Sequence, residues 1–206
     1  MLHHEVRDED QLLTYINTKW HLGEYGKIYG ISTNKISPDI DLLRLEQSTR
    51  TVIGYEFKII NYHKAWKRAN LTPIYTGIGQ TLTYFNFGVD ISNLVLGISP
   101  EMPEDVIPPL RKTIEEVIMP LKCFKQVADD LQKQVFFGGE FSPIDLTGMM
   151  SKYSKGIGCI GVLVWNGHDD TLTTLLKAEK VFPMGNELMH KHNCLLKKEF
   201  KSKIKF

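Results

Sequence analysis

The sequence predicts an α/β fold with a mixed central sheet, made of a three-strand antiparallel meander plus further strands and flanked by helices. Three observations predict it. Residues Thr51–Ile60 alternate with the period of a strand, two shorter strand-like segments precede them, and amphipathic helical segments lie before and after this block. No linker divides the 206 residues, so we expect a single domain over 1–206, with its core over about 8–100 and additions over 101–206.

The first element is expected to be a helix that begins after Asp8, a plausible N-cap. From Glu9 onward, the apolar residues recur at the spacing of one helical face: Leu12, Leu13 and Ile16. Strands are expected next at Lys27–Ser32 and Ile40–Glu46, and short connections join them to Thr51–Ile60.

The strand Thr51–Ile60 has two different faces, because side chains alternate along a strand. One face is wholly apolar: Ile53, Tyr55, Phe57 and Ile59. The other face combines apolar residues with a carboxylate and an amine: Val52, Gly54, Glu56, Lys58 and Ile60. Glu56 and Lys58 therefore project from the same side of an otherwise apolar strand.

The rest of the chain is expected to add helices and strands around this sheet. A helix is expected at about Ile74–Phe87, with an apolar stripe of Ile74, Ile78, Leu82 and Phe85, and a strand follows at Asn93–Ser99. A second helix starts at Pro108–Pro109, with a stripe of Ile114, Val117, Ile118 and Leu121. The remaining elements are a helix over Phe124–Leu131, a strand at Gly156–Trp165 and a last helix with a basic tail.

Composition excludes several classes of protein. The net charge of +1 means that any attraction for nucleic acid must come from local patches. Cys123, Cys159 and Cys194 are isolated, which argues against a disulfide scaffold or zinc ribbon and suits a reducing, intracellular setting. With no apolar run near eighteen residues and no apolar segment at the N-terminus, we expect neither secretion nor a membrane span.

Asp39 and Asp41 share a strand face and lie one antiparallel return upstream of Glu56 and Lys58. These carboxylates would repel one another unless a hard cation lay between them, and Mg²⁺ or Mn²⁺ takes such oxygen ligands. Asp39, Asp41 and Glu56 are therefore the candidate metal ligands, with Lys58 placed to orient a water and stabilise charge on a phosphodiester. The alternative is an exposed Glu–Lys pair on a solvated sheet face.

Pro38–Asp39 followed by Glu56–Phe57–Lys58 resembles the signature of the PD-(D/E)XK nuclease superfamily, which includes restriction enzymes, Holliday-junction resolvases and RecB-type exonucleases. The overall pattern also resembles a resolvase-like nuclease of archaeal spindle-shaped viruses. The resemblance covers roughly Glu9–Ser99 and implies a restriction-endonuclease-like fold. It also implies that Glu9, on the first helix, supports the metal. Literal Pro–Asp favours Asp39, whereas the apolar run after Asp41 favours Asp41.

The helix after the Glu-x-Lys strand carries Gln80 and Tyr84, which is similar to the Gln-x-x-x-Tyr element of RecB-like members. The two residues lie one turn apart, on a face that the sequence places away from the apolar stripe. The resemblance therefore implies that Gln80 helps to position the site and that Tyr84 contacts the site or DNA. The alternative is a surface pair without a role.

A basic, aromatic cluster follows the candidate site, in which Lys64, Lys67 and Arg68 surround Trp66. These cations are expected to contact DNA phosphates, and the alternative is a polar loop with one half-buried Trp. The basic tail 197–206 offers a second such patch. A homodimer is expected, since paired sites would match the two strands of DNA.

The sequence thus predicts a metal-dependent DNA endonuclease, with branched DNA as one candidate substrate. Two alternatives stay open: a non-catalytic nucleic-acid-binding or scaffolding protein that keeps the fold, and an unrelated α/β domain with a chance Glu-x-Lys. His190–His192 and His168–Asp170 lack a third ligand at a recognisable spacing, so surface histidines explain them better than metal sites do.

Overall fold

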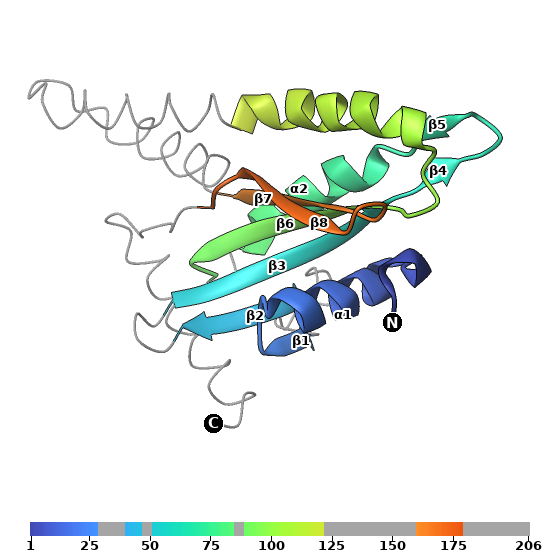
Figure 1. Cartoon of the computed structure of the whole chain (residues 1–206). Coiled ribbons are helices and arrows are strands. Elements are labelled where there is room, and N and C mark those ends of the chain that lie inside the picture. The colour runs from blue at the N-terminus through green and yellow to red at the C-terminus, as the bar shows by residue number, and fades with distance from the viewer. Residues whose placement is uncertain (29–39, 47–50, 85–88, 122–159, 179–206) are drawn as a thin grey trace, which may run out of the picture.

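The computed structural model describes residues 1–28, 40–46, 51–84, 89–121 and 160–178, and its centre is one mixed sheet with helices on both faces (Figure 1). The sheet has six strands in the order β1-β2-β3-β6-β7-β8. Their bounds are β1 Tyr25–Ile28, β2 Ile40–Glu46, β3 Thr51–Ile60, β6 Ile91–Ile98, β7 Gly161–Asn166 and β8 Thr171–Leu176. The predicted fold class, a mixed sheet flanked by helices, is confirmed.

Strand β3 lies inside the sheet and joins its antiparallel and parallel halves. β1, β2 and β3 pair antiparallel in chain order, which confirms the predicted meander. β6 pairs parallel with β3, and β7 pairs parallel with β6. A parallel pair needs a crossover connection, and the helix α2 (Thr72–Tyr84) supplies it between β3 and β6.

One face of the sheet is covered by the helix α1 (Glu9–Trp20), which follows a short 3₁₀ helix, η1 (His3–Glu5). Asp8 is its N-cap, as predicted, and the Asp8 side chain accepts the Gln11 N–H at 2.8 Å. The buried residues of this layer come from the segment before α1, from α1 and from the apolar faces of the central strands: Val6, Leu12, Ile16, Leu42, Tyr55, Phe57, Ile59, Val95 and Trp165. The apolar face predicted for β3 therefore packs against α1.

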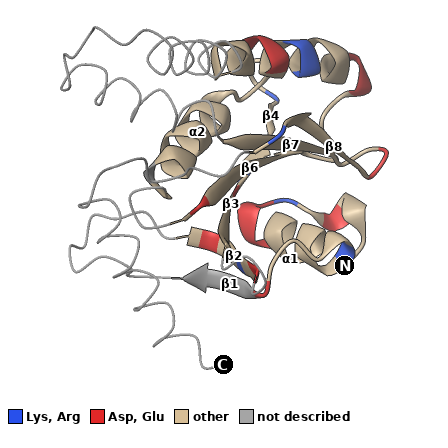
Figure 2. Ribbon diagram, turned by 90° about the vertical axis from the view of Figure 1, so that its left-hand side faces the viewer, with Lys and Arg blue, Asp and Glu red and all other residues tan. Residues whose placement is uncertain are grey.

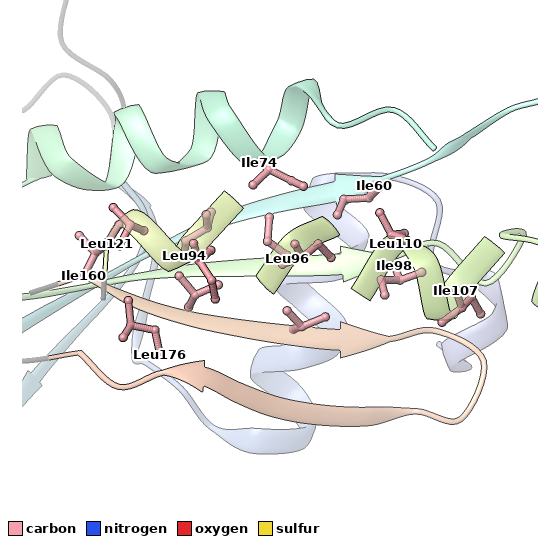
Figure 3. Close-up of a cluster of buried hydrophobic side chains, with 14 of the residues drawn as sticks. Ile60, Ile74, Leu94, Leu96, Ile98, Ile107, Leu110, Leu121, Ile160 and Leu176 are labelled. Carbon is pink, nitrogen blue, oxygen red and sulfur yellow. The ribbon is translucent and has the colours of Figure 1, made fainter. Parts of the chain in front are cut away.

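The opposite face is covered by α2 and by a helix over 107–121, which follows the 3₁₀ helix η3 (Glu104–Val106). Figure 3 shows the core between them, where Ile74 of α2 and Leu110 of the second helix lie over Ile60 and the β6 side chains. The helix over 107–121 contributes five buried residues, and β6 contributes its alternate residues: Ile107, Leu110, Ile114, Ile118 and Leu121 from the helix, and Leu94, Leu96 and Ile98 from β6. Glu56 and Lys58 project toward this layer.

A small antiparallel hairpin lies between β3 and α2 in the chain. Its strands are β4 (Tyr62–His63) and β5 (Arg68–Ala69), and Figure 1 shows it projecting beyond the end of the main sheet. Tyr62 and Ala69 at its base pack against the core, whereas His63 to Arg68 are exposed. The hairpin is thus an exposed extension with a packed root.

Several boundaries differ from the sequence prediction. β1 begins at Tyr25, two residues before Lys27, and β8 was not predicted. The predicted helix over Phe124–Leu131, the basic tail 197–206 and the three cysteines lie outside the described residues. None of the described helices combines the length and apolar character needed to cross a bilayer.

The buried side of α2 is not the predicted one. The fully buried residues are Ile74, Gly77, Thr81 and Tyr84, while Ile78 and Leu82 are partly buried at its margin. The cause is close packing: a Cβ added at Gly77 would lie 2.5 Å from Leu94 Cδ1 and 3.0 Å from Lys58 Cγ. Small residues therefore let α2 approach β3 and β6, and this approach decides which side of the helix is buried.

The close approach gives a matched pair of glycine substitutions in α2. A Cβ at Gly79 would meet nothing within 4 Å, so Gly79→Ala should stabilise the protein by up to about 1 kcal/mol through helix propensity. Gly77→Ala gains the same propensity but overfills the core, at a cost of about 1–3 kcal/mol. Urea unfolding should therefore rank Gly79→Ala above the wild type and Gly77→Ala at or below it. Equal stabilisation by both substitutions would contradict the tight packing of α2.

Candidate active site at the end of the β2–β3 pairing

The candidate site lies where β2 stops pairing with β3. The last described pair in that direction is Leu42 with Tyr55, so Asp41 and Glu56 are the next residues on each strand. At this point the Asp41 side chain replaces the β2 backbone as the hydrogen-bond acceptor for β3, because its Oδ2 accepts the Phe57 N–H at 2.8 Å. A strand N–H beyond the described pairing with β2 is thereby satisfied by a carboxylate in place of a backbone carbonyl. Asp41 is held beside Glu56 by this bond.

Glu56 and Lys58 form a buried ion pair. Lys58 Nζ lies 2.7 Å from Glu56 Oε1, and the Glu56 side chain is only 1% exposed. The same ammonium lies 3.1 Å from Glu9 Oε2, whose side chain is 45% exposed. The predicted alternative, a solvated Glu–Lys pair, is therefore wrong, because both residues are buried.

The contact with Glu9 links the two faces of the sheet. The stem of Lys58 lies against Gly77 on the α2 face, whereas Glu9 begins α1 on the opposite face. Within the described residues, no strand pairs with β3 on the β2 side beyond Tyr55. The Lys58 side chain can therefore pass around this open edge and reach Glu9.

Tyr84 holds the second oxygen of Glu56. Its side chain is fully buried, and its hydroxyl donates a hydrogen bond to Glu56 Oε2. Gly54 makes room for the ring, since a Cβ there would lie 3.2 Å from Tyr84 Cδ2. The prediction that Tyr84 lies away from the packed side of α2 is wrong, and Tyr84 has no exposed surface for the predicted DNA contact. It is instead a positioning residue for Glu56.

The charges of the site perturb one another. Burial and the nearby Asp41 charge raise the pKa of Glu56 to about 7, although its bonds from Lys58 and Tyr84 act in the opposite direction. Burial lowers the pKa of Lys58, but hydrogen bonds and charges from Glu56 and Glu9 outweigh it, so the net shift is upward. Burial and the Glu56 carboxylate raise the pKa of Tyr84, which therefore stays a donor. The ammonium persists while the two carboxylates repel each other.

Asp41 and Glu56 are the carboxylates of the site that could hold a divalent cation. Among the described residues, no group of three His, Cys, Asp or Glu side chains surrounds one point. Mg²⁺ usually takes one or two carboxylates and completes its shell with waters and phosphate oxygens. Asp41 and Glu56 are such a pair, and a cation would relieve the repulsion that raises the pKa of Glu56. Asp39, the third predicted ligand, lies outside the described residues.

The remaining predicted residues fall at two places. Gln80 lies one turn before Tyr84 on α2 and is partly buried. Lys64, Lys67 and Arg68 lie on the exposed β4–β5 hairpin. Trp66 between them is 64% exposed, so the alternative of a half-buried Trp is wrong.

Asp170, in the segment His168–Asp170 that was not predicted to bind a metal, makes several structural hydrogen bonds. Its carboxylate accepts from Tyr15 Oη at 2.7 Å, from Trp165 Nε1 at 3.0 Å and from Lys19. These bonds tie the turn between β7 and β8 to α1, the helix that carries Glu9. Burial raises the pKa of Tyr15 to about 12, and the bond to Asp170 adds to this shift.

Comparison of the chain with protein-family models, with curated proteins and with solved structures gave no match. The function is therefore inferred from the geometry of these residues.

The contact between Tyr84 and Glu56 predicts an unequal effect of two Tyr→Phe substitutions on α2. Tyr84→Phe removes a buried donor to a carboxylate and should lower the free energy of unfolding by about 1.5–3 kcal/mol. Tyr75→Phe is the control, because Tyr75 is 59% exposed and should change stability by less than about 0.5 kcal/mol.

Urea unfolding of the metal-free protein measures both effects. A double-mutant cycle with Glu56→Gln should show that the two sites are coupled. Additive effects would mean that Tyr84 does not act through Glu56.

Proposed function

We propose that this protein is a metal-dependent deoxyribonuclease that hydrolyses phosphodiester bonds. One observation carries the proposal: a buried carboxylate and a buried lysine, Glu56 and Lys58, share one strand face beside the second carboxylate of Asp41. Buried charges such as these do not add to the stability of the fold, because apolar residues of similar size at the same positions would make the protein as stable or more stable. Their presence therefore favours a role in binding or catalysis. A site for a cation and a phosphate explains all three residues together.

Asp41 and Glu56, with Asp39 as the third candidate, would hold Mg²⁺ or Mn²⁺. The bound ion would supply positive charge to the phosphate and make a bound water more acidic. Lys58 has a fixed ammonium two residues from Glu56, so it is placed to orient the attacking water and to stabilise the charge that develops on phosphorus. Glu9 and Tyr84 hold Lys58 and Glu56 in position. Gln80, one turn before Tyr84 on α2, would help to position the site.

A specific observation favours a second candidate function, a nucleic-acid-binding protein without turnover. The Lys58 ammonium already bonds both Glu56 and Glu9. Its positive charge therefore offsets part of the negative charge of these two carboxylates without a metal ion. Metal affinity separates the two candidates. A nuclease site binds Mg²⁺ with Asp41 and Glu56, and a purely structural ion pair does not.

The expected homodimer and its DNA substrate remain predictions. A twofold dimer would present two sites to the two strands of a duplex or junction. Light scattering in the presence of DNA measures this state directly.

Lys58→Ala should abolish metal-dependent DNA cleavage, with a loss of at least about 10²-fold, because charge stabilisation at the phosphate is removed. The assay uses labelled linear, single-stranded and four-way-junction DNA with Mg²⁺, with Mn²⁺ and with a chelator. Lys112→Ala is the matched control, since Lys112 is 79% exposed and pairs with Glu116 on the helix over 107–121. It should cleave like the wild type.

Calorimetry gives a readout that does not depend on cleavage. Wild-type protein should bind Mg²⁺, and Glu56→Ala should not. Binding of DNA without metal affinity or cleavage would instead establish the second candidate function.

The hairpin cations give a prediction for binding alone. The triple substitution of Lys64, Lys67 and Arg68 by Ala should reduce the magnitude of the slope of log K against log salt by about 2 to 3. Each lost phosphate contact contributes about 0.7–0.9 to this reduction. Lys19→Ala is the control, because Lys19 is paired with Asp170, and it should leave the slope unchanged. Titrations at several salt concentrations, in chelator, measure this slope. An unchanged slope in the triple variant would remove the hairpin from the DNA interface.

A further inference from the structure

The β4–β5 hairpin has a structured tip. The Trp66 N–H donates to the His63 carbonyl at 3.1 Å, which closes a tight turn, and Lys67 follows with a positive φ of 48°. Below the tip, the Asn70 N–H donates to the Asn61 carbonyl at 2.9 Å, and Tyr62 packs against the core. The orientation of the tip is therefore set by main-chain bonds and by a packed root.

The turn presents an aromatic stack to solvent. The rings of His63 and Trp66 lie with their centroids 4.1 Å apart and their planes within 8°. The Arg68 guanidinium carbon lies 4.9 Å from the centre of the Trp66 ring, as a cation over an aromatic face. Trp66 is nevertheless 64% exposed, the highest value among the exposed large apolar side chains of the described residues. A large, ordered aromatic surface is thus left in water.

The hairpin and the chain on either side of it carry positive charge. The sequence from Phe57 to Val89 contains no Asp or Glu, whereas the hairpin alone contributes Lys64, Lys67 and Arg68. The neighbouring α2 has no charged residue, as its uniform tan ribbon in Figure 2 shows. The ligand that complements this surface has flat aromatic groups and negative charges at short intervals. A single strand of nucleic acid has both, because each base offers a π-face and each linkage a phosphate.

Duplex DNA complements the surface less well. Its bases are stacked on one another, so their faces are not available to a side chain unless a step is opened. An exposed aromatic stack gains binding energy by stacking on unpaired bases. The cations alone would bind single-stranded and duplex DNA alike. The combination of ring and charge favours a strand that is already unpaired.

We propose that the His63–Trp66 stack binds an unpaired base of DNA, with Lys64, Lys67 and Arg68 on the flanking phosphates. The choice of DNA as the nucleic acid rests on the proposed function. The hairpin follows β3 directly, and the eight residues from Lys58 to Trp66 span at most about 29 Å. The nuclease therefore takes DNA that carries a single-stranded segment near the cut, such as a flap, a gap or a branch point.

Intrinsic fluorescence tests the proposal with little interference. Trp165 is fully buried and Trp20 is partly buried, so a bound base should quench Trp66 most. Oligothymidylate added in the presence of chelator should quench the wild type, and a blunt duplex should quench it much less. Trp66→Phe should lose the quenching, whereas Trp20→Phe, the matched control, should keep it.

Affinity is measured on the same samples. Trp66→Ala should weaken oligothymidylate binding about tenfold or more and change duplex binding by less than about twofold. Trp66→Phe should recover most of the affinity, because a phenyl ring still stacks. Met119→Ala, which removes a half-exposed side chain from the helix over 107–121, should change neither affinity.

The outcomes separate this proposal from the nuclease proposal. Cleavage that depends on Lys58, combined with oligothymidylate binding that ignores Trp66, would overturn the stacking site and leave the nuclease. Absence of cleavage, combined with Trp66-dependent oligothymidylate binding, would overturn the nuclease and leave the stacking site. Equal weakening of single-stranded and duplex binding by Trp66→Ala would also reject the stacking site.

Discussion

Burial of the Glu56 carboxylate is the constraint around which the site is arranged. A carboxylate that is 1% exposed must be surrounded by donors or cations, and each neighbour supplies one. Lys58 binds Oε1 and Tyr84 binds Oε2, while Asp41 adds a negative charge that neither of them removes. Asp41 has a structural bond of its own, because its carboxylate accepts the Phe57 N–H. The cation site proposed above gives the same carboxylate a second role beside Glu56.

The site lies at the edge of β3 beyond its described pairing with β2. On one side β6 pairs with β3 through the whole active segment, with Glu56 opposite Leu94 and Lys58 opposite Leu96. On the other side the described pairing with β2 ends at Tyr55. One side therefore fixes the backbone. On the other side the Glu9 side chain is 45% exposed and Asp41 is partly buried, whereas Lys58 is buried.

The sequence was sufficient where a pattern has a single geometric meaning. Alternation along Thr51–Ile60 placed Glu56 and Lys58 on one face, and Asp8 marked the start of α1. It failed where contact depends on small residues. Hydrophobicity assigned the buried side of α2 to Ile78 and Leu82, but Gly77 and Thr81 allow the closest approach to the sheet, and this turns Tyr84 toward Glu56. β8 was missed because its three exposed Thr and three Leu do not alternate strictly, although the turn Asn166–Asp170 before it was a usable signal.

The rigidity of β3 also connects the two proposals. Glu56 and Lys58 lie on β3, and the chain continues from β3 through Asn61 into the β4–β5 hairpin. The N–H of Ser99, the residue after β6, donates to the Ile60 carbonyl at 3.1 Å. The end of β3 is therefore held from the β6 side as well, so the hairpin root cannot rotate freely relative to the carboxylates. A strand of DNA held at the tip of the hairpin would be held at a set distance from Lys58. The position of a cut relative to an unpaired base would then follow from the length of β3 and its hairpin.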